Sequence, residues 1–279
     1  MQLTPRYDGP TVLSIEVRDE GTHPVMRQRR RLEARLQDLD AADWQRPSRC
    51  TGWTVQDVVT HLTSTNTFWA ISIQAGLAGN PTRFLASFDP VASPAQLVEQ
   101  ARGTSVSETL RQFSEGVDAM ADALDAVGAD GWDVLAEAPP GHLPIRLVAD
   151  HALWDAWIHE RDILLPLGQD PATEDDEIRC SLRYAAGLGR AFALSRGDRD
   201  ARAMVIETTD PPDRIVVVAG DDVVRIHGGS APEGSMHLSG DSVALAELLS
   251  IREVDVPAPP GLDWLTAGLA TVFDNGAPG

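Results

Sequence analysis

Three residues that can bind a metal are spaced four apart, at His151, Asp155 and His159. A four-residue step along an α-helix differs from one full turn by only ~40°, so the three side chains would lie on one face. A helix that supplies an imidazole and a carboxylate needs a third ligand from elsewhere to complete a site. His61, in a separate stretch with helical character, is the best candidate. The spacing therefore predicts a metal site that draws on this face and on His61.

The types of these residues limit the chemistry. Two neutral imidazoles and one carboxylate suit Zn²⁺ and leave a coordination position open, which is typical of catalytic rather than structural zinc. A thiol bound at an open position is stabilised as the thiolate, which is its nucleophilic form. The same ligand types also form the facial triad of non-haem Fe(II) oxygenases. The residues alone leave both chemistries open.

The first half of the chain must supply the helices that position these ligands. Apolar residues at intervals of three to four predict four long helices and one short one. Their expected ranges are 26–39, 54–75, 97–101, 107–127 and 143–168. Thr54 is an expected N-cap, with Asp57 three residues later in a variant capping box. Four long helices with antiparallel connections predict a four-helix bundle, and side chains of facing helices build metal sites in bundle cores.

In the second half of the chain, the spacing of the apolar residues is no longer helical. Runs of β-branched residues at 203–209, 214–219 and 223–227 predict strands, and 236–238 predicts a further short one. Helices are expected near 180–194, 242–250 and 262–273. The fold class is therefore α plus α+β, with a four-helix bundle over 1–170, a polar linker, and a small α+β domain over 175–279.

Composition excludes several classes of function. The chain has 279 residues, 43% of them hydrophobic, and a net charge of −19 with arginine as its only strongly basic residue. The absence of lysine removes Schiff-base and P-loop lysine chemistry, and the acidity argues against nucleic acid as a partner. No stretch reaches the ~20 apolar residues of a membrane helix, and no signal sequence is evident, so we expect a cytoplasmic protein, monomeric or homodimeric.

Two motifs carry a resemblance to a known family. The run Gly52-Trp53-Thr-Val leads to His61, and Asp155-Ala-Trp-Ile-His159 is followed by Glu-Arg-Asp-Ile. Together these motifs resemble the DinB-like family of mycothiol-dependent maleylpyruvate isomerases. The resemblance covers nearly the whole chain, because the second half is similar to a carboxy-terminal domain related to sterol carrier proteins.

The resemblance implies a four-helix bundle that holds a divalent metal, usually zinc, on His61, Asp155 and His159; iron and nickel remain alternatives. It also implies an isomerase or S-transferase that activates mycothiol, a low-molecular-weight thiol, and adds it to an electrophilic small molecule. The family has glutamate where this chain has Asp155, so the carboxylate is one methylene shorter. His151 then becomes an alternative metal ligand or a hydrogen-bond partner of one.

The resemblance implies a role for Arg252 as well. The family usually has a Gly-Arg dipeptide that contributes an arginine to the active site, and here Ile251 replaces the glycine. Arg252 is the expected catalytic residue, holding a carboxylate of the thiol or the substrate by two parallel hydrogen bonds. Apart from the resemblance, Asp162 is expected to be a cap or an ion-pair partner near the end of its helix, with Arg161 or Arg146 as the candidate arginine.

Fold does not decide function, and three classes stay in view. The first is the thiol-dependent enzyme. The second is a non-haem iron oxygenase on the same ligands, although those triads usually lie on β-barrels. The third is a non-catalytic protein that binds a metal or a small molecule in resistance or regulation.

Overall fold

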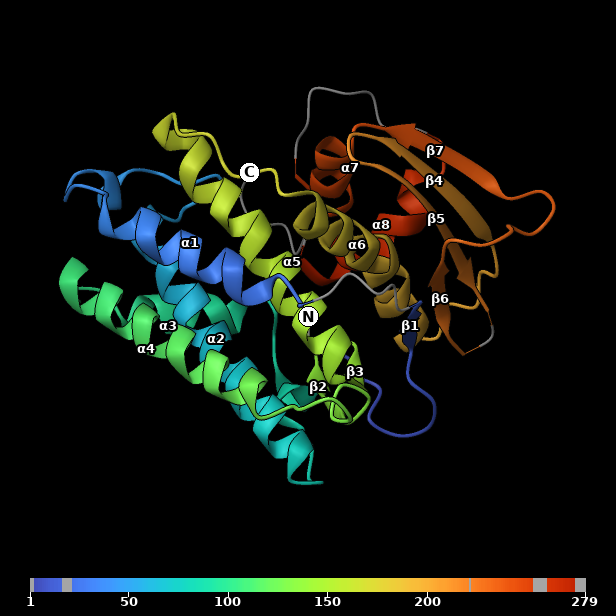
Figure 1. Cartoon of the computed structure of the whole chain (residues 1–279), viewed down its shortest axis with the longest axis horizontal. Coiled ribbons are helices and arrows are strands. Elements are labelled where there is room, and N and C mark those ends of the chain that lie inside the picture. The colour runs from blue at the N-terminus through green and yellow to red at the C-terminus, as the bar shows by residue number, and fades with distance from the viewer. Residues whose placement is uncertain (1–2, 17–21, 221, 253–259, 274–279) are drawn as a thin grey trace.

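The computed structural model describes residues 3–16, 22–220, 222–252 and 260–273. Long helices form one side of the molecule, and a sheet covered by helices forms the other (Figure 1). The two sides share a continuous hydrophobic core that extends from the bundle to the sheet. None of the helices in these ranges is long and apolar enough to cross a membrane.

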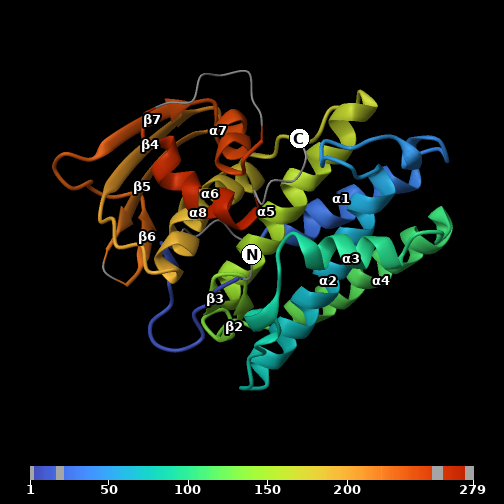
Figure 2. The same ribbon diagram turned by 180° about the vertical axis from the view of Figure 1, so that it is seen from behind.

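Four long helices build the bundle (Figure 2). They are α1 (Val25–Gln37), α2 (Val55–Leu77), α4 (Val106–Asp125) and α5 (Ile145–Leu164). Shorter helices lie in their connections: η1 (Asp43–Gln45), η2 (Phe84–Ser87), α3 (Ala92–Gln100) and η3 (Leu165–Leu167). An antiparallel hairpin, β2 (Leu135–Ala138) and β3 (Gly141–Pro144), leads into α5.

Local sequence explains how the two helices with the ligands begin and pack. Thr54 caps α2, its side chain accepting the backbone N–H of Asp57 while the Asp57 carboxylate accepts the backbone N–H of Thr54. This reciprocal pair satisfies two amide groups at the helix start. Helix α5 is buried along most of its length, because the bundle covers one side of it and α6 (Asp175–Ser195) the other.

The second part of the chain forms a five-stranded sheet in the order β1-β6-β5-β4-β7. Its strands are β1 (Leu13–Ile15), β4 (Ala203–Thr209), β5 (Pro212–Ala219), β6 (Val224–His227) and β7 (Met236–Gly240). Strand β1 is parallel to β6 and β7 is parallel to β4, whereas β4-β5 and β5-β6 are antiparallel.

Helices α6, α7 (Ser242–Leu249) and α8 (Leu262–Phe273) pack beside this sheet (Figure 1). Helices α6 and α8 approach each other very closely. A Cβ atom on Gly189 would lie 2.0 Å from the carbonyl oxygen of Leu265, and one on Gly268 would lie 1.8 Å from the carbonyl oxygen of Gly189. Glycine is therefore required on both helices where they cross.

The structure confirms the expected mixture of a helical first part and an α+β second part. Two features were not predicted from the sequence: β2 and β3 form a hairpin, and β1 joins the sheet of the second part although it lies within 1–170. Strands of three or four residues are too short to show an alternating pattern in sequence. The boundaries 1–170 and 175–279 remain a prediction.

Candidate metal centre and its pocket

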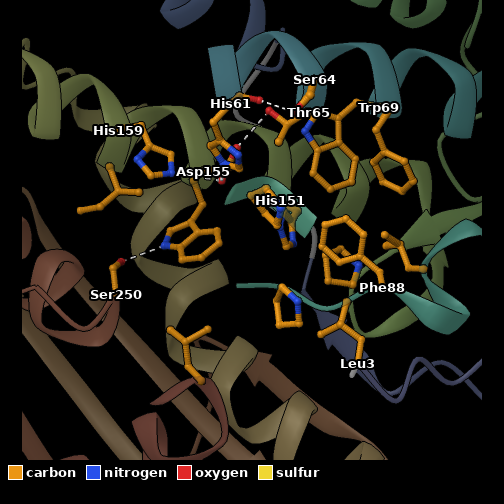
Figure 3. Close-up of a pocket in the computed structure, with 18 of the residues that line it drawn as sticks. Leu3, His61, Ser64, Thr65, Trp69, Phe88, His151, Asp155, His159 and Ser250 are labelled. Carbon is orange, nitrogen blue, oxygen red and sulfur yellow. Dashed lines mark hydrogen bonds and ion pairs between the residues drawn. The ribbon is translucent and has the colours of Figure 1, made fainter. Parts of the chain in front are cut away.

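Helices α2 and α5 bring the three expected ligands together. Nε2 of His61 lies 3.8 Å from Oδ1 of Asp155, and Nε2 of His159 lies 3.7 Å from the same oxygen. The two imidazole rings meet edge to face with centroids 5.0 Å apart. One ligand atom from each residue lies within 4.8 Å of the others. Their labelled side chains converge in Figure 3.

These distances are compatible with three ligands of a divalent metal. Separations of 3.7 and 3.8 Å are too long for a hydrogen bond. Tetrahedral zinc with bonds of ~2.0–2.1 Å would place neighbouring ligand atoms roughly 3.3 Å apart, so the three side chains would have to move inward to hold it. In addition, Nδ1 of His61 is buried and has no hydrogen-bond partner in the described parts of the chain. Among the described residues, neither nitrogen of this ring has a partner within hydrogen-bond distance.

Second interactions orient two of the ligands. Nδ1 of His159 lies 3.0 Å from Oδ2 of Asp162, which leaves Nε2 to face Asp155. The hydroxyl of Thr65 shares its hydrogen between the Leu62 carbonyl at 3.1 Å and Oδ2 of Asp155 at 3.3 Å, and Oδ1 of Asp155 faces the imidazoles. Such partners fix the ring orientation of metal ligands and raise their basicity.

Asp162 is the centre of a buried charge network. Its carboxylate is fully buried and accepts hydrogen bonds from Arg49 and Arg252 in addition to His159. Burial raises the pKa of this carboxyl group, but the contacts with His159 and Arg252 lower it far more, so Asp162 is held as an anion. The expected pairing with Arg161 or Arg146 is wrong, because Arg161 binds Glu247 and Arg146 binds Asp133.

The charge network also changes the pKa of His159. Burial lowers this pKa, but Cys50, Asp162 and Asp155 raise it to about 10. The pKa of Asp155 shifts in the opposite direction. Burial raises it, but the contacts with His61 and His159 lower it more and hold it below the usual range. Without a metal, His159 therefore carries a proton at neutral pH.

A pocket of about 400 Å³ opens beside the three ligands (Figure 3). Side chains of α2, η2, α3 and α5 form most of its wall. Residues 250–252 after α7 contribute another part, and the wall is completed by Leu3, Phe88, Pro90, Pro139 and Leu269. Ser250 is held against α5 because its hydroxyl accepts a 2.8 Å hydrogen bond from Nε1 of Trp154. The pocket therefore lies between the bundle and the segment that follows α7 in the second part of the chain.

Comparison with known proteins gives a family. The model of the mycothiol maleylpyruvate isomerase N-terminal domain matches residues 25–164. The chain belongs to this family. Because the matched range contains α1, α2, α4 and α5, the family identity covers all three expected metal ligands.

The fold has relatives among solved structures. The crystal structure of the mycothiol-dependent maleylpyruvate isomerase superposes with a TM-score of 0.60 at 14% identity, covering 85% of this chain and 93% of the other. A histidine-to-alanine mutant of that enzyme gives the same values. No curated protein sequence matches the chain. At 14% identity the likeness establishes the fold alone.

Arg252, the expected catalytic residue, lies at the pocket wall and is paired with the carboxylate of Asp162. Nη2 of Arg252 donates to Oδ2 of Asp162 across 2.7 Å, Nε contacts both oxygens of that carboxylate, and Nη1 donates to the Ser250 carbonyl. The guanidinium thus makes the expected paired hydrogen bonds to a carboxylate of the protein itself.

The position before Arg252 explains why glycine would be usual there. Ile251 has φ of +58° and follows the end of α7. Its N–H binds the Leu248 carbonyl and the N–H of Arg252 binds the Glu247 carbonyl, which together form a Schellman motif. Glycine favours this left-handed position, and isoleucine adopts it here at a cost in strain.

His151 does not belong to the ligand group in the described structure. Its Nδ1 lies 2.7 Å from the hydroxyl of Tyr184, and its ring packs against Trp69 and Trp154. Burial lowers its pKa to about 4, although the charge of Asp155 opposes this shift. His151 is therefore a neutral part of the pocket wall, and the short carboxylate of Asp155 approaches both imidazoles without it.

Sequence reasoning missed two parts of the site. Cys50 was given no role in the site from the sequence, yet its sulfur lies 3.3 Å from Oδ2 of Asp162 and 3.6 Å from Nδ1 of His159. Its place in the run that leads to His61 was the available signal. Glu137 was missed altogether; it is fully buried and fixes the segment with Phe84 by accepting its backbone N–H.

Proposed function

We propose that this protein is a metal-dependent enzyme that activates a low-molecular-weight thiol, mycothiol as in its family, for addition to an electrophilic small molecule or for its isomerisation. The observation that carries this proposal is the convergence of two Nε2 atoms and one carboxylate oxygen on the wall of a pocket of about 400 Å³. Membership of the isomerase family supports the choice of thiol.

His61, Asp155 and His159 would hold the ion. A divalent metal with an open position supplies a stabilised thiolate near neutral pH. The residues of this chain prepare the place for it: Asp162 fixes the tautomer of His159, and Thr65 fixes the carboxylate of Asp155. The wall around them is largely apolar and limits access of water to the reacting sulfur.

We propose that the main role of Arg252 is exerted through Asp162 and not through contact with the substrate. Its guanidinium neutralises the buried carboxylate that orients His159. It also belongs to the pocket wall, so a neutral acceptor oxygen of the bound molecule could contact the N–H groups that Asp162 leaves free. His151 is proposed to shape the pocket and not to bind the metal.

Metal content and turnover test the proposal together. We expect one zinc per chain by elemental analysis of mildly purified protein, and mycothiol-dependent consumption of an electrophile followed by mass spectrometry. His61→Ala and His159→Ala should each lose the metal and at least ~10²-fold in turnover. His237→Ala is the matched control, because His237 is an exposed histidine on β7. Protein that carries no stoichiometric metal would contradict the proposal.

The alternatives have distinct results in the same experiment. Stoichiometric iron with oxygen consumption and no thiol requirement would replace the proposal by the oxygenase. A metal that is present while every electrophile is recovered unchanged would indicate a binding protein.

A further inference from the structure

The wall of the pocket has a marked chemical bias. Aromatic side chains supply much of it, namely those of Phe68, Trp69, Phe84, Phe88 and Trp154. Prolines and aliphatic side chains supply most of the remainder. Sites that bind small molecules combine such apolar walls with a few placed polar groups, so the polar groups decide which substituents are accepted.

Cationic groups are scarce in this wall. Apart from three histidines, the only basic side chain among the described lining residues is Arg252. Its guanidinium already pairs with Asp162, which is fully buried. The carboxylate of Asp155 adds a negative charge at the inner end. The two positive charges of the proposed metal ion would be balanced by Asp155 and the bound thiolate, and Arg252 is balanced by Asp162. A substrate carboxylate would therefore enter the pocket without a counterion of its own, which is costly.

Apolar surface continues to the mouth of the pocket. Phe84 is 61% exposed and Leu97 is 43% exposed, although both are large hydrophobic residues. Exposed apolar surface that adjoins a cavity commonly marks a site of binding. It extends the apolar character of the wall outward.

This apolar wall is held in place by a buried anchor. Glu137, fully buried on β2, accepts hydrogen bonds from the hydroxyl of Thr82 and from the backbone N–H groups of Phe84 and Leu85. Two of the anchored residues, Phe84 and Leu85, line the pocket. Burial of a carboxylate is costly, and here it fixes a segment at the surface. We therefore infer that the position of this segment is important for the shape of the pocket.

We propose that the electrophile is a bulky apolar molecule with an aromatic or alicyclic body next to an activated double bond, and not a small dicarboxylate. This inference rests on the proposed function for its reaction. The thiolate sulfur forms a bond to the β-carbon of the double bond, the π-electron pair moves to the α-carbon, and this carbon takes up the proton that the thiol released. The addition needs no oxidant or reductant.

A matched pair of electrophiles tests the substrate class. The probes are 4-phenyl-3-buten-2-one and its 4-carboxyphenyl analogue, which share the reacting double bond and differ by one carboxylate. With zinc-loaded enzyme and mycothiol, we expect kcat/KM to favour the phenyl compound by at least about 30-fold, because the analogue must bury an unpaired charge. Maleylpyruvate should be poorer still. Equal kcat/KM values for the two probes would overturn the inference. A higher kcat/KM for the 4-carboxyphenyl analogue or for maleylpyruvate would also overturn it.

A substitution at the pocket mouth tests whether the wall causes the preference. Phe84→Arg adds a cation at a residue that is already largely exposed, so the fold should tolerate it. We expect the ratio of kcat/KM for the phenyl compound to kcat/KM for the carboxyphenyl analogue to fall about 10-fold in this variant. Ile71→Arg is the matched control, because Ile71 is 43% exposed on α2 and lies outside the described pocket lining. An equal change in both variants would assign the effect to net charge and overturn the inference.

A binding measurement separates this inference from the proposed function. Saturated 4-phenylbutan-2-one and its carboxylated analogue cannot react, and Trp69 and Trp154 in the wall report binding by fluorescence. Selective binding of the apolar ketone without turnover of any electrophile would refute the enzyme and keep the ligand class. Thiol-dependent turnover that prefers carboxylates would keep the enzyme and refute the ligand class.

Discussion

Asp162 binds the far nitrogen of His159, with Oδ2 of the carboxylate 3.0 Å from Nδ1 of the imidazole. The contact leaves Nε2 of His159 to face Asp155 at the inner end of the pocket. The same carboxylate binds Arg252, which follows α7 in the second part of the chain. The orientation of one expected metal ligand therefore depends on a residue from beyond the bundle.

Removing the charge of Asp162 should weaken the metal site. Asp162→Asn keeps the size of the side chain but leaves two arginines and an imidazole without their anion. We expect zinc affinity to fall about 10- to 100-fold and the free energy of unfolding to fall by roughly 3 kcal/mol. Competition with a chromophoric chelator and urea denaturation measure the two effects. Asp133→Asn, at an exposed carboxylate, is the control; unchanged zinc affinity in Asp162→Asn would show that the contact does not orient His159.

Metal affinity should depend on pH through His159. The pKa of this residue is raised to about 10, so the free protein carries a proton that a metal-bound imidazole cannot keep. Binding then releases this proton at every pH below about 10, and affinity should rise with pH by up to about tenfold per unit between pH 6 and 8. Calorimetry in buffers of different ionisation enthalpy counts the protons. Zinc binding that releases none would contradict the raised pKa.

The backbone at Ile251 should gain stability from glycine. The residue holds φ of +58° at the position of a Schellman motif where glycine is usual. Ile251→Gly removes strain of about 1–2 kcal/mol and costs roughly 0.5–1 kcal/mol in chain entropy, so a small net gain is expected. Ile251→Ala keeps the Cβ atom and the strain, and should not gain. Thermal unfolding of the two variants measures the difference, and an Ile251→Ala protein as stable as Ile251→Gly would argue against strain.

Much of the bundle followed from local patterns, whereas the contacts that complete the site did not. The Thr54 capping box and the four-residue spacing of Asp155 and His159 are local features, because caps and helix faces involve neighbours in sequence. The pairing of Asp162 with Arg252 joins residues 90 positions apart. No periodicity encodes such a pair, and nearer arginines were equally reasonable partners. The position of His151 was open for the same reason, because its partner Tyr184 lies on α6.

Glu137 provides the last test, because one carboxylate fixes the apolar pocket wall. It accepts hydrogen bonds from the hydroxyls of Tyr7 and Thr82 and from the backbone N–H groups of Phe84 and Leu85. In Glu137→Gln one acceptor oxygen becomes an NH₂ donor, which leaves two of these donors without an acceptor. We expect the free energy of unfolding to fall by roughly 2–4 kcal/mol and the apolar ketone to bind more weakly. Urea denaturation and tryptophan fluorescence measure the two effects.

The control for this substitution is Glu115→Gln, because Glu115 is a largely exposed glutamate on α4 that pairs only at the surface. Surface pairs of this kind contribute at most about 1 kcal/mol, so the control should keep both its stability and its ligand binding. The two readouts also separate folding from function in Glu137→Gln. Lower stability with unchanged binding of the ketone would mean that the segment 82–85 is anchored for the fold alone, and the position of Phe84 would then lose its role in ligand selection.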